Sequence, residues 1–210
     1  FVGEVVASFR AAESAVMVVG AKAGVEIETI KLWRRLDGRN MPRMVFINKM
    51  DIDRAEYQKT LDDLRAKFDA TFVPVTVPIG AGSDYKGVVN LIDMKAYLAQ
   101  GLGQKETTVD IPEEVKAMVD EFHETLVESA AEGDDELTVK YLEEESLTLE
   151  EVKRGIMEGL RENKVVPVLC GSAIQSSGIS GLLDLVTWAA PSPVGIKEIA
   201  VNGDDSEREV

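Results

Sequence analysis

Residues 44–51 read Met-Val-Phe-Ile-Asn-Lys-Met-Asp, and this octapeptide is the clearest indication of fold class in the chain. Its first four residues are apolar, which is typical of a strand buried on both faces of a parallel sheet. Polar residues follow at once, namely Asn48, Lys49 and Asp51. In open parallel sheets, ligands bind just beyond the carboxyl ends of the strands. The octapeptide therefore predicts a strand that delivers three polar side chains to a ligand site.

The residue types after this strand suit recognition of a guanine base. Asn48, Lys49 and Asp51 fit an N-K-x-D pattern. The Asp51 carboxylate can accept two parallel hydrogen bonds from the N1–H and N2–H₂ groups of guanine, and adenine offers no such pair. A bidentate pair of this kind contributes about 1–3 kcal/mol of discrimination against the wrong base. The Lys49 stem can lie along the base plane, and the Asn48 amide can contact the base and tie loops together.

The alternative is that these residues are ordinary loop and cap residues between a strand and a helix, which is common. A second segment favours the guanine site. Residues 165–170 predict another buried strand, and it ends in Gly171, Ser172 and Ala173. Small residues let backbone N–H groups approach a ligand closely, and one such group can donate to guanine O6. Alone this tripeptide indicates a turn, but after the N-K-x-D loop it supports a guanine site.

Strand and helix patterns alternate around these two segments. A short apolar run predicts a further buried strand at residues 15–19. Helical spacing of apolar residues predicts helices at residues 1–12, 26–36, 53–68 and 179–189, with Asp53 as the cap of the third. Residues 72–79 contain Pro74 and Pro78, so they fit an edge strand or a bend into a new unit. This order predicts an α/β fold with parallel crossover units.

An acidic block interrupts the alternation between residues 82 and 163. It carries 21 acidic and 8 basic residues, against 17 and 15 in the rest of the chain. Its patterns predict extended segments at 88–92 and 95–97 and helices at 112–131, 136–144 and 148–162. We interpret residues 82–163 as an inserted α/β subdomain, residues 1–81 and 164–193 as one domain, and residues 194–210 as a linker.

The acidic surface excludes one class of partner. A strongly negative block repels phosphate backbones, so we expect no direct nucleic-acid binding. A solvated acidic face and a surface for a basic protein both stay open. No apolar run approaches the roughly 20 residues of a membrane span, so no membrane partner is expected. Cys170 is the only cysteine, which excludes an internal disulfide and fits a reducing cytoplasm.

The motifs in this order resemble elongation factor G, a translational GTPase. The resemblance covers about residues 1–193 and rests on residues 44–51, 78–80, 87–91, 168–173, 182–184 and 191–193. It implies a P-loop NTPase-type G domain, a parallel sheet with flanking helices, plus an inserted subdomain that faces the ribosomal stalk protein. It implies that Asn48, Lys49 and Asp51 bind the guanine of GTP or GDP, with the segment from Gly171 to Ala173 closing over it. A paralogue, a ribosomal-protection protein and a release-factor relative stay open.

Other expected parts of such a site do not occur in these 210 residues. No G-x-x-x-x-G-K-[ST] phosphate loop is present, and residues 20–24 are only superficially similar to one. Residues 84–87 match D-x-x-G in letters but lie inside the acidic block, so we expect them not to bind magnesium. The resemblance implies that the first strands, the phosphate loop and the Mg²⁺ ligands precede Phe1. We therefore expect no catalytic residue and no metal ligand here, and no GTP hydrolysis by this chain alone.

Three further residues have side chains that often occur in active sites, but we expect structural roles for them. Cys170 is expected to be a small buried residue rather than a nucleophile, because no base motif accompanies it. His123 is expected on a helix surface, and Trp33 in the core.

Overall fold

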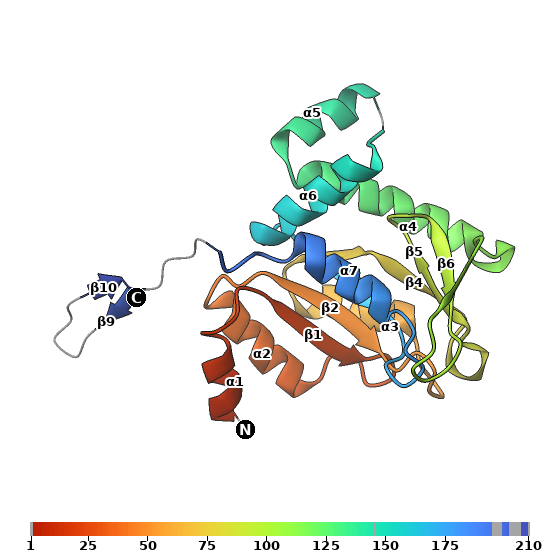
Figure 1. Cartoon of the computed structure of the whole chain (residues 1–210), viewed down its shortest axis with the longest axis horizontal. Helices are drawn as coiled ribbons and strands as arrows, with labels where there is room; N and C mark the ends of the chain where they lie inside the picture. Colours follow the sequence, from red (N-terminus) through yellow and green to blue (C-terminus); the bar gives the residue numbers. More distant parts are fainter. Residues whose placement is uncertain (1, 145, 195–198, 202–206, 210) are drawn as a thin grey trace.

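A four-stranded parallel sheet forms the centre of the computed structural model, which describes residues 2–144, 146–194, 199–201 and 207–209 (Figure 1). Its strands, in spatial order, are β1 (Ala15–Gly20), β2 (Arg43–Asn48), β8 (Val165–Cys170) and β3 (Thr71–Pro74). All three pairings are parallel. The burial of β2 and β8 explains their central place, since almost every residue in both is buried. The predicted α/β fold with a parallel sheet is confirmed.

Helices α2 (Ile27–Asp37) and α3 (Tyr57–Lys67) bury one apolar stripe each, as their spacing predicts. Trp33 of α2 stacks on Phe68 with the ring centroids 4.2 Å apart. The guanidinium of Arg43 lies 4.6 Å from the Trp33 ring centroid, within cation–π distance. Trp33 is therefore a core residue, as expected. The short helix α1 (Val2–Ser8) precedes β1.

Helix α3 begins later than predicted, and Asp53 does not cap it. Arg54 has a φ of 62°, a left-handed conformation that an α-helix cannot include. The N–H of Glu56, the residue before the helix, donates to the Ala21 carbonyl at 3.0 Å. A contact with a distant loop, rather than the local cap signal, thus sets the start at Tyr57.

A second sheet, entirely antiparallel, follows the edge of the first. It is built from β4 (Thr76–Ile79), β5 (Gly87–Asn90), β6 (Lys95–Leu98) and β7 (Thr107–Val109), in that order. The single residue Val75 separates β3 from β4, and its N–H donates to the Val168 carbonyl at 2.7 Å. Residues 72–79 were predicted to form either an edge strand or a bend into a new unit, and they form both.

The second sheet begins before the predicted insert does. Strand β4 precedes residue 82 yet pairs with β5, and the short 3₁₀ turn η1 (Gly82–Asp84) connects the two. Strand β7 was not predicted, because its three residues, Thr107, Thr108 and Val109, lack an apolar alternation and are mostly exposed. The division of the chain into domains at these boundaries stays a prediction.

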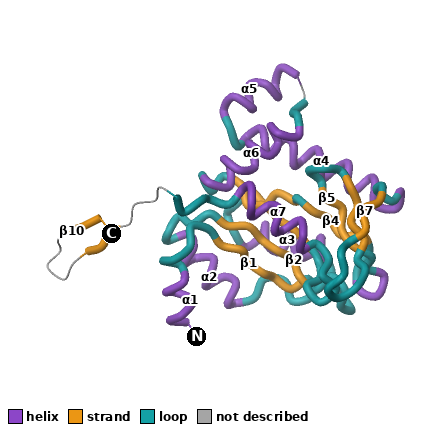
Figure 2. The backbone as a smooth tube through the Cα atoms, viewed as in Figure 1, coloured by secondary structure: helices purple, strands orange, loops and turns teal. Residues whose placement is uncertain are grey.

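Three helices follow the second sheet, close to where the sequence predicts them. They are α4 (Glu113–Glu132), α5 (Asp135–Glu144) and α6 (Leu149–Arg161), and α5 projects away from the rest in Figure 2. The predicted capping box is present, since Thr148 N donates to the Glu151 carboxylate at 2.8 Å. Helices α4 and α6 approach closely at Gly155, where an added Cβ would lie 1.9 Å from the Ala130 carbonyl oxygen.

The chain then returns through β8 to helix α7 (Ile179–Ala189), which passes in front of the parallel sheet in Figure 1. In the stretch predicted as a linker, β9 (Ile199–Val201) pairs antiparallel with β10 (Glu207–Glu209). The remaining residues of that stretch, 195–198, 202–206 and 210, lie outside the described residues. Within the described part of the chain, no helix is both long and apolar enough to cross a membrane.

Candidate functional site

Three loops meet at the carboxyl edge of the parallel sheet. Parallel pairing places Gly20 beside Asn48 and Ile47 beside Cys170, so the loops after β1, β2 and β8 begin side by side. The Gly171 N–H donates to the Ile47 carbonyl at 3.0 Å, and the Met50 N–H donates to the Gly171 carbonyl at 3.1 Å. The structure therefore brings together the two loops that the sequence predicts to form a site. They are residues 48–51, the N-K-x-D loop, and residues 171–178, the β8–α7 loop.

Asn48 ties these two loops through one side-chain oxygen. Its Oδ1 accepts hydrogen bonds from the Lys49 amide at 2.8 Å and from the Ala173 amide at 3.0 Å. Because Oδ1 accepts both bonds, the Nδ2 group is left as a donor of two hydrogens. No protein group among the described residues accepts a hydrogen bond from it. Asn48 thus holds the loops together while keeping its donor free.

Lys49 occupies a strained backbone conformation. Its φ is 66°, in the left-handed region, where a residue other than glycine costs about 1–3 kcal/mol. The bonds of Asn48 and Met50 hold it there. The Lys49 side chain is exposed and that of Asp51 is half-buried. Within the described part of the chain, neither charged group forms an ion pair or a hydrogen bond with protein, so both are available to a ligand.

Glycine is required at both ends of the β8–α7 loop. A Cβ on Gly171 would lie 2.2 Å from the Ser177 carbonyl oxygen, and Gly178 has a φ of 75°. Between them, Ser172 and Ser177 exchange two backbone hydrogen bonds of 3.0 Å each as an antiparallel bridge. Ser172 is completely buried, whereas Ala173 is exposed at the tip. The small-residue run therefore makes a tight loop that presents Ala173 beside Asn48.

The D-x-x-G letters at residues 84–87 have a structural role that sequence reasoning missed. The Gly82 N–H donates to the Met50 carbonyl at 2.8 Å. The hydroxyl of the buried Tyr85 lies 2.8 Å from the Ser177 hydroxyl. The turn therefore contacts the N-K-x-D loop and the β8–α7 loop from behind. Asp84 belongs to η1.

A cavity of about 370 Å³ opens next to Asn48 and Lys49. The other residues around it come from β1, from the segment between β1 and α2, and from the position directly after the N-K-x-D loop: Val18, Gly20, Lys22, Ala23, Glu26 and Ile52. Residues 20–24, set aside as only superficially similar to a phosphate loop, thus lie beside the candidate site. Asp63 of α3 holds this loop, since its carboxylate accepts from the Val25 amide at 2.8 Å.

Cys170 at the end of β8 is not a nucleophile. Its side chain is completely buried, and burial raises the pKa of its thiol to about 12, so the group is neutral at neutral pH. The Cys170 amide donates to the Thr76 hydroxyl at 2.8 Å, which links β8 to β4. His123 is a half-buried residue of α4 whose Nδ1 lies 2.9 Å from the Leu91 carbonyl oxygen. Among the described residues no cluster of three or more His, Cys, Asp or Glu side chains could hold a metal.

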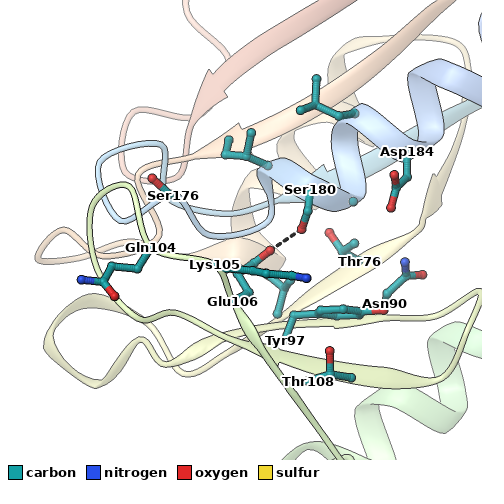
Figure 3. Close-up of a pocket in the computed structure, with 14 residues that line it drawn as sticks. Thr76, Asn90, Tyr97, Gln104, Lys105, Glu106, Thr108, Ser176, Ser180 and Asp184 are labelled. Atoms are coloured by element: carbon teal, nitrogen blue, oxygen red, sulfur yellow. Dashed lines mark hydrogen bonds between the residues drawn. The ribbon is translucent and has the colours of Figure 1, made fainter.

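A larger cavity, of about 500 Å³, lies between the second sheet, the loop after β6 and the start of α7 (Figure 3). Its wall is mixed in charge, with Lys105, Glu106 and Asp184 among the lining residues. The Glu106 carboxylate accepts a hydrogen bond from the Gly178 amide at 2.8 Å and another from the Ser180 hydroxyl. This cavity does not include the N-K-x-D loop, so we place the candidate site at the sheet edge, where the free polar groups are.

Comparison with known proteins agrees with the fold. Residues 1–192 match the family described as the elongation factor Tu GTP binding domain. The structure is also similar to the crystal structure of a protein from Thermus thermophilus, with a TM-score of 0.85 and 30% sequence identity. That match covers 96% of this chain and 32% of the Thermus protein, so the chain spans about a third of the relative's length. The chain therefore belongs to the elongation factor Tu GTP binding domain family, the GTP- and GDP-binding domains of translational GTPases.

Proposed function

We propose that this chain is the guanine-recognising part of a ribosome-associated GTPase of the elongation factor G type. The observation that carries the proposal is the bond between Asn48 Oδ1 and the Ala173 amide, with the Asn48 Nδ2 donor and the Asp51 carboxylate left unpaired at the same sheet edge. Unpaired hydrogen-bonding groups held by a rigid frame are what a specific polar ligand requires.

Each edge of guanine has a complement here. The Asp51 carboxylate accepts from N1–H and N2–H₂, and the Asn48 Nδ2 group donates to the N7 acceptor. The Ala173 amide, at the exposed tip of the β8–α7 loop, donates to O6 and shares its hydrogen with Asn48. The Lys49 stem covers one face of the base. Adenine has an amino group in place of O6, and it would leave the Asp51 carboxylate unpaired, at a cost of about 1–3 kcal/mol.

Hydrolysis in this proposal belongs to the full-length protein. Phosphoryl transfer depends on a phosphate loop, a Mg²⁺ ion and a positioned water, and no phosphate-loop motif occurs in these 210 residues. We propose that residues outside this sequence bind Mg²⁺ and the phosphates, and that GTP hydrolysis there is coupled to translocation in the cytoplasm. A ribosomal-protection protein or a release-factor relative is the alternative within the same family.

A titration of the 210-residue chain with guanosine, GDP and ADP tests the proposal. We expect guanosine and GDP to bind weakly and with similar affinity, with or without Mg²⁺, because the contacts are with the base. ADP should bind at least tenfold more weakly, the equivalent of about 1.4 kcal/mol. Equal affinity for ADP and GDP would refute guanine recognition. Tight, Mg²⁺-dependent binding of GDP would refute the proposal that this chain binds only the base and that residues outside it bind Mg²⁺ and the phosphates.

A second function, compatible with the first, has its own observation. Val139 and Leu142 of α5 and Leu149 of α6 are 57%, 77% and 44% exposed, within the acidic block. Exposed apolar side chains surrounded by charge are typical of a protein-binding surface. We propose that this surface docks on a ribosomal stalk protein. Leu142→Ser in the whole chain should abolish salt-sensitive binding to that protein and leave the melting temperature unchanged.

A further inference from the structure

The second sheet and its loops hold the β8–α7 loop at three points. The Tyr85 hydroxyl lies 2.8 Å from the Ser177 hydroxyl, and the Gly103 amide donates to the Ser176 hydroxyl at 3.0 Å. At the third point the Glu106 carboxylate binds the Gly178 amide and the Ser180 hydroxyl. Residues 85–106 thus contact one face of the loop, while Asn48 contacts Ala173 at its tip.

Glu106 binds the N-terminal end of α7 through both of its carboxylate oxygens. The N-cap position of α7 is Gly178, which has no side chain and leaves the first amides of the helix without a local acceptor. Glu106, 72 residues away in sequence, accepts through Oε1 from the amide of Gly178 itself at 2.8 Å, the bond that a glutamate inside the first turn of the helix makes in a capping box. A carboxylate at a helix N-terminus is also stabilised by the helix dipole. Figure 3 shows Glu106 and Ser180 joined in this way at the cavity between the second sheet and α7.

The position of Gly178 is transmitted to the base-contacting end of the loop. Ser177 is bonded to Ser172 by two backbone hydrogen bonds, and Ser172 directly precedes Ala173. The loop between them, residues 173–176, is short, and its one large apolar side chain, Ile174, is 72% exposed, so apolar packing contributes little to holding it. Fixing Ser177 and Gly178 from outside therefore fixes where the Ala173 amide points.

We infer that Glu106 is a positioning residue for guanine recognition, acting through the β8–α7 loop on the contact to guanine O6. The inference rests on the proposed function. It links the antiparallel sheet, which has no contact with the base, to the affinity of the site for its nucleotide. Tyr85 is the second support of the same loop.

Glu106→Ala and Tyr85→Phe in the 210-residue chain test this inference, with Glu124→Ala as the control. Glu124 is an exposed carboxylate of α4 in the same acidic block, so its loss changes the net charge equally. We expect Glu106→Ala to weaken GDP binding about five- to tenfold, because the free energy that a helix cap contributes to local stability would then have to be supplied on binding. Glu106→Gln keeps one acceptor and should lose less, and Glu124→Ala should bind as the unchanged chain does.

A modified base separates positioning from general loss of stability. In 6-thio-GDP a weakly accepting sulfur replaces O6, so a variant that misplaces the O6 donor has little left to lose. Glu106→Ala should therefore weaken 6-thio-GDP binding less than about twofold. Equal losses for GDP and 6-thio-GDP would overturn the positioning role, and so would unchanged GDP affinity.

Hydrogen exchange keeps this result distinct from failure of the proposed function. Glu106→Ala should speed exchange of the Ser172 and Ser177 amides roughly tenfold, while that of Val45 in β2 stays unchanged. If the unchanged chain shows no preference for guanine, the proposed function fails even where this exchange result holds. If exchange at Ser172 and Ser177 is unaffected, the support by Glu106 is refuted, whatever the nucleotide preference.

Discussion

The side-chain oxygen of Asn48 lies 3.0 Å from the amide nitrogen of Ala173, and this bond joins the loops that follow β2 and β8. The same oxygen accepts from the Lys49 amide at 2.8 Å. One side chain therefore has two duties, because its oxygen holds the frame and its NH₂ group is free for a ligand. The two duties can be separated by substitution.

Asn48→Asp should keep the frame and lose the ligand contact. A carboxylate still accepts from both amides but offers no hydrogen to guanine N7. We expect GDP affinity to fall roughly tenfold with little change in melting temperature. Asn48→Ala loses both duties and leaves the Ala173 amide without its acceptor, so it should also destabilise the chain by about 1–3 kcal/mol. Calorimetric titration and thermal melting of the two variants measure the difference; wild-type affinity in Asn48→Asp would contradict the N7 contact.

Asp51→Asn should move base preference from guanine towards xanthine. An amide at this position pairs one donor and one acceptor with a base edge, which suits the N1–H and carbonyl at C2 of xanthine. The shift should be about five- to hundredfold in the ratio of GDP to XDP affinity. A competition assay with both nucleotides measures it. Asp53→Asn is the control, because the side chain of Asp53 is 89% exposed and pairs with Arg54; a similar shift in both variants would show that charge alone is responsible.

Gly155→Ala should destabilise the chain, although alanine is the better helix former. Propensity alone favours the alanine by about 1 kcal/mol. At Gly155, however, the new Cβ would lie 1.9 Å from the Ala130 carbonyl oxygen, so α4 and α6 must separate, at a cost of about 1–3 kcal/mol that exceeds the gain. Gly181→Ala in α7 is the matched case, since its Cβ would find only an ordinary contact of 3.8 Å. Urea unfolding should show opposite signs for the two variants.

The buried thiol of Cys170 makes stability fall in alkaline solution. Burial raises its pKa to about 12 in the folded chain, whereas an unfolded thiol titrates near 8.5, as is usual. Between these values the folded state binds more protons than the unfolded state. The contribution is therefore complete below about pH 8.5 and is lost at about 1.4 kcal/mol per pH unit as the pH rises towards 12.

Urea unfolding of the wild-type chain and of Cys170→Ala at pH 8, 9, 10 and 11 checks this effect. The variant should be less stable at pH 8, because it leaves a small cavity, but its stability should fall less steeply above pH 9. Burial also raises the pKa of Tyr57 and Tyr85, which adds to the loss above pH 10 in both proteins. Parallel pH profiles for the two proteins would contradict the buried, neutral thiol.

Much of the fold could be predicted because local patterns carry it. The buried strands β2 and β8 are recognisable in the sequence as continuous apolar runs. The capping box of Thr148 and Glu151 predicts the start of α6 to within one residue. The start of α3 could not be predicted in this way. There the left-handed Arg54 and the bond from Glu56 to Ala21 override a local cap at Asp53.

The candidate site divides in the same manner. Asn48, Lys49 and Asp51, and the small residues from Gly171 to Ala173, are adjacent in sequence to the strands that deliver them, so their place at the sheet edge follows from fold class. Tyr85 and Glu106 carry no such signal. Tyr85 stands within letters typical of another motif, and Glu106 is one carboxylate among 21 acidic residues of its block.

An α/β chain with two polar loops at strand ends follows from local patterns, because periodicity and small-residue runs are properties of neighbouring residues. Three features appear only in the folded chain: β8 lies between β2 and β3, the chain leaves the parallel sheet at Val75, and Glu106 binds the amide of Gly178, 72 residues away, at the start of α7. These depend on which surfaces exclude water together and which unpaired amide finds an acceptor. Such pairings join distant parts of the chain, and no local pattern encodes them.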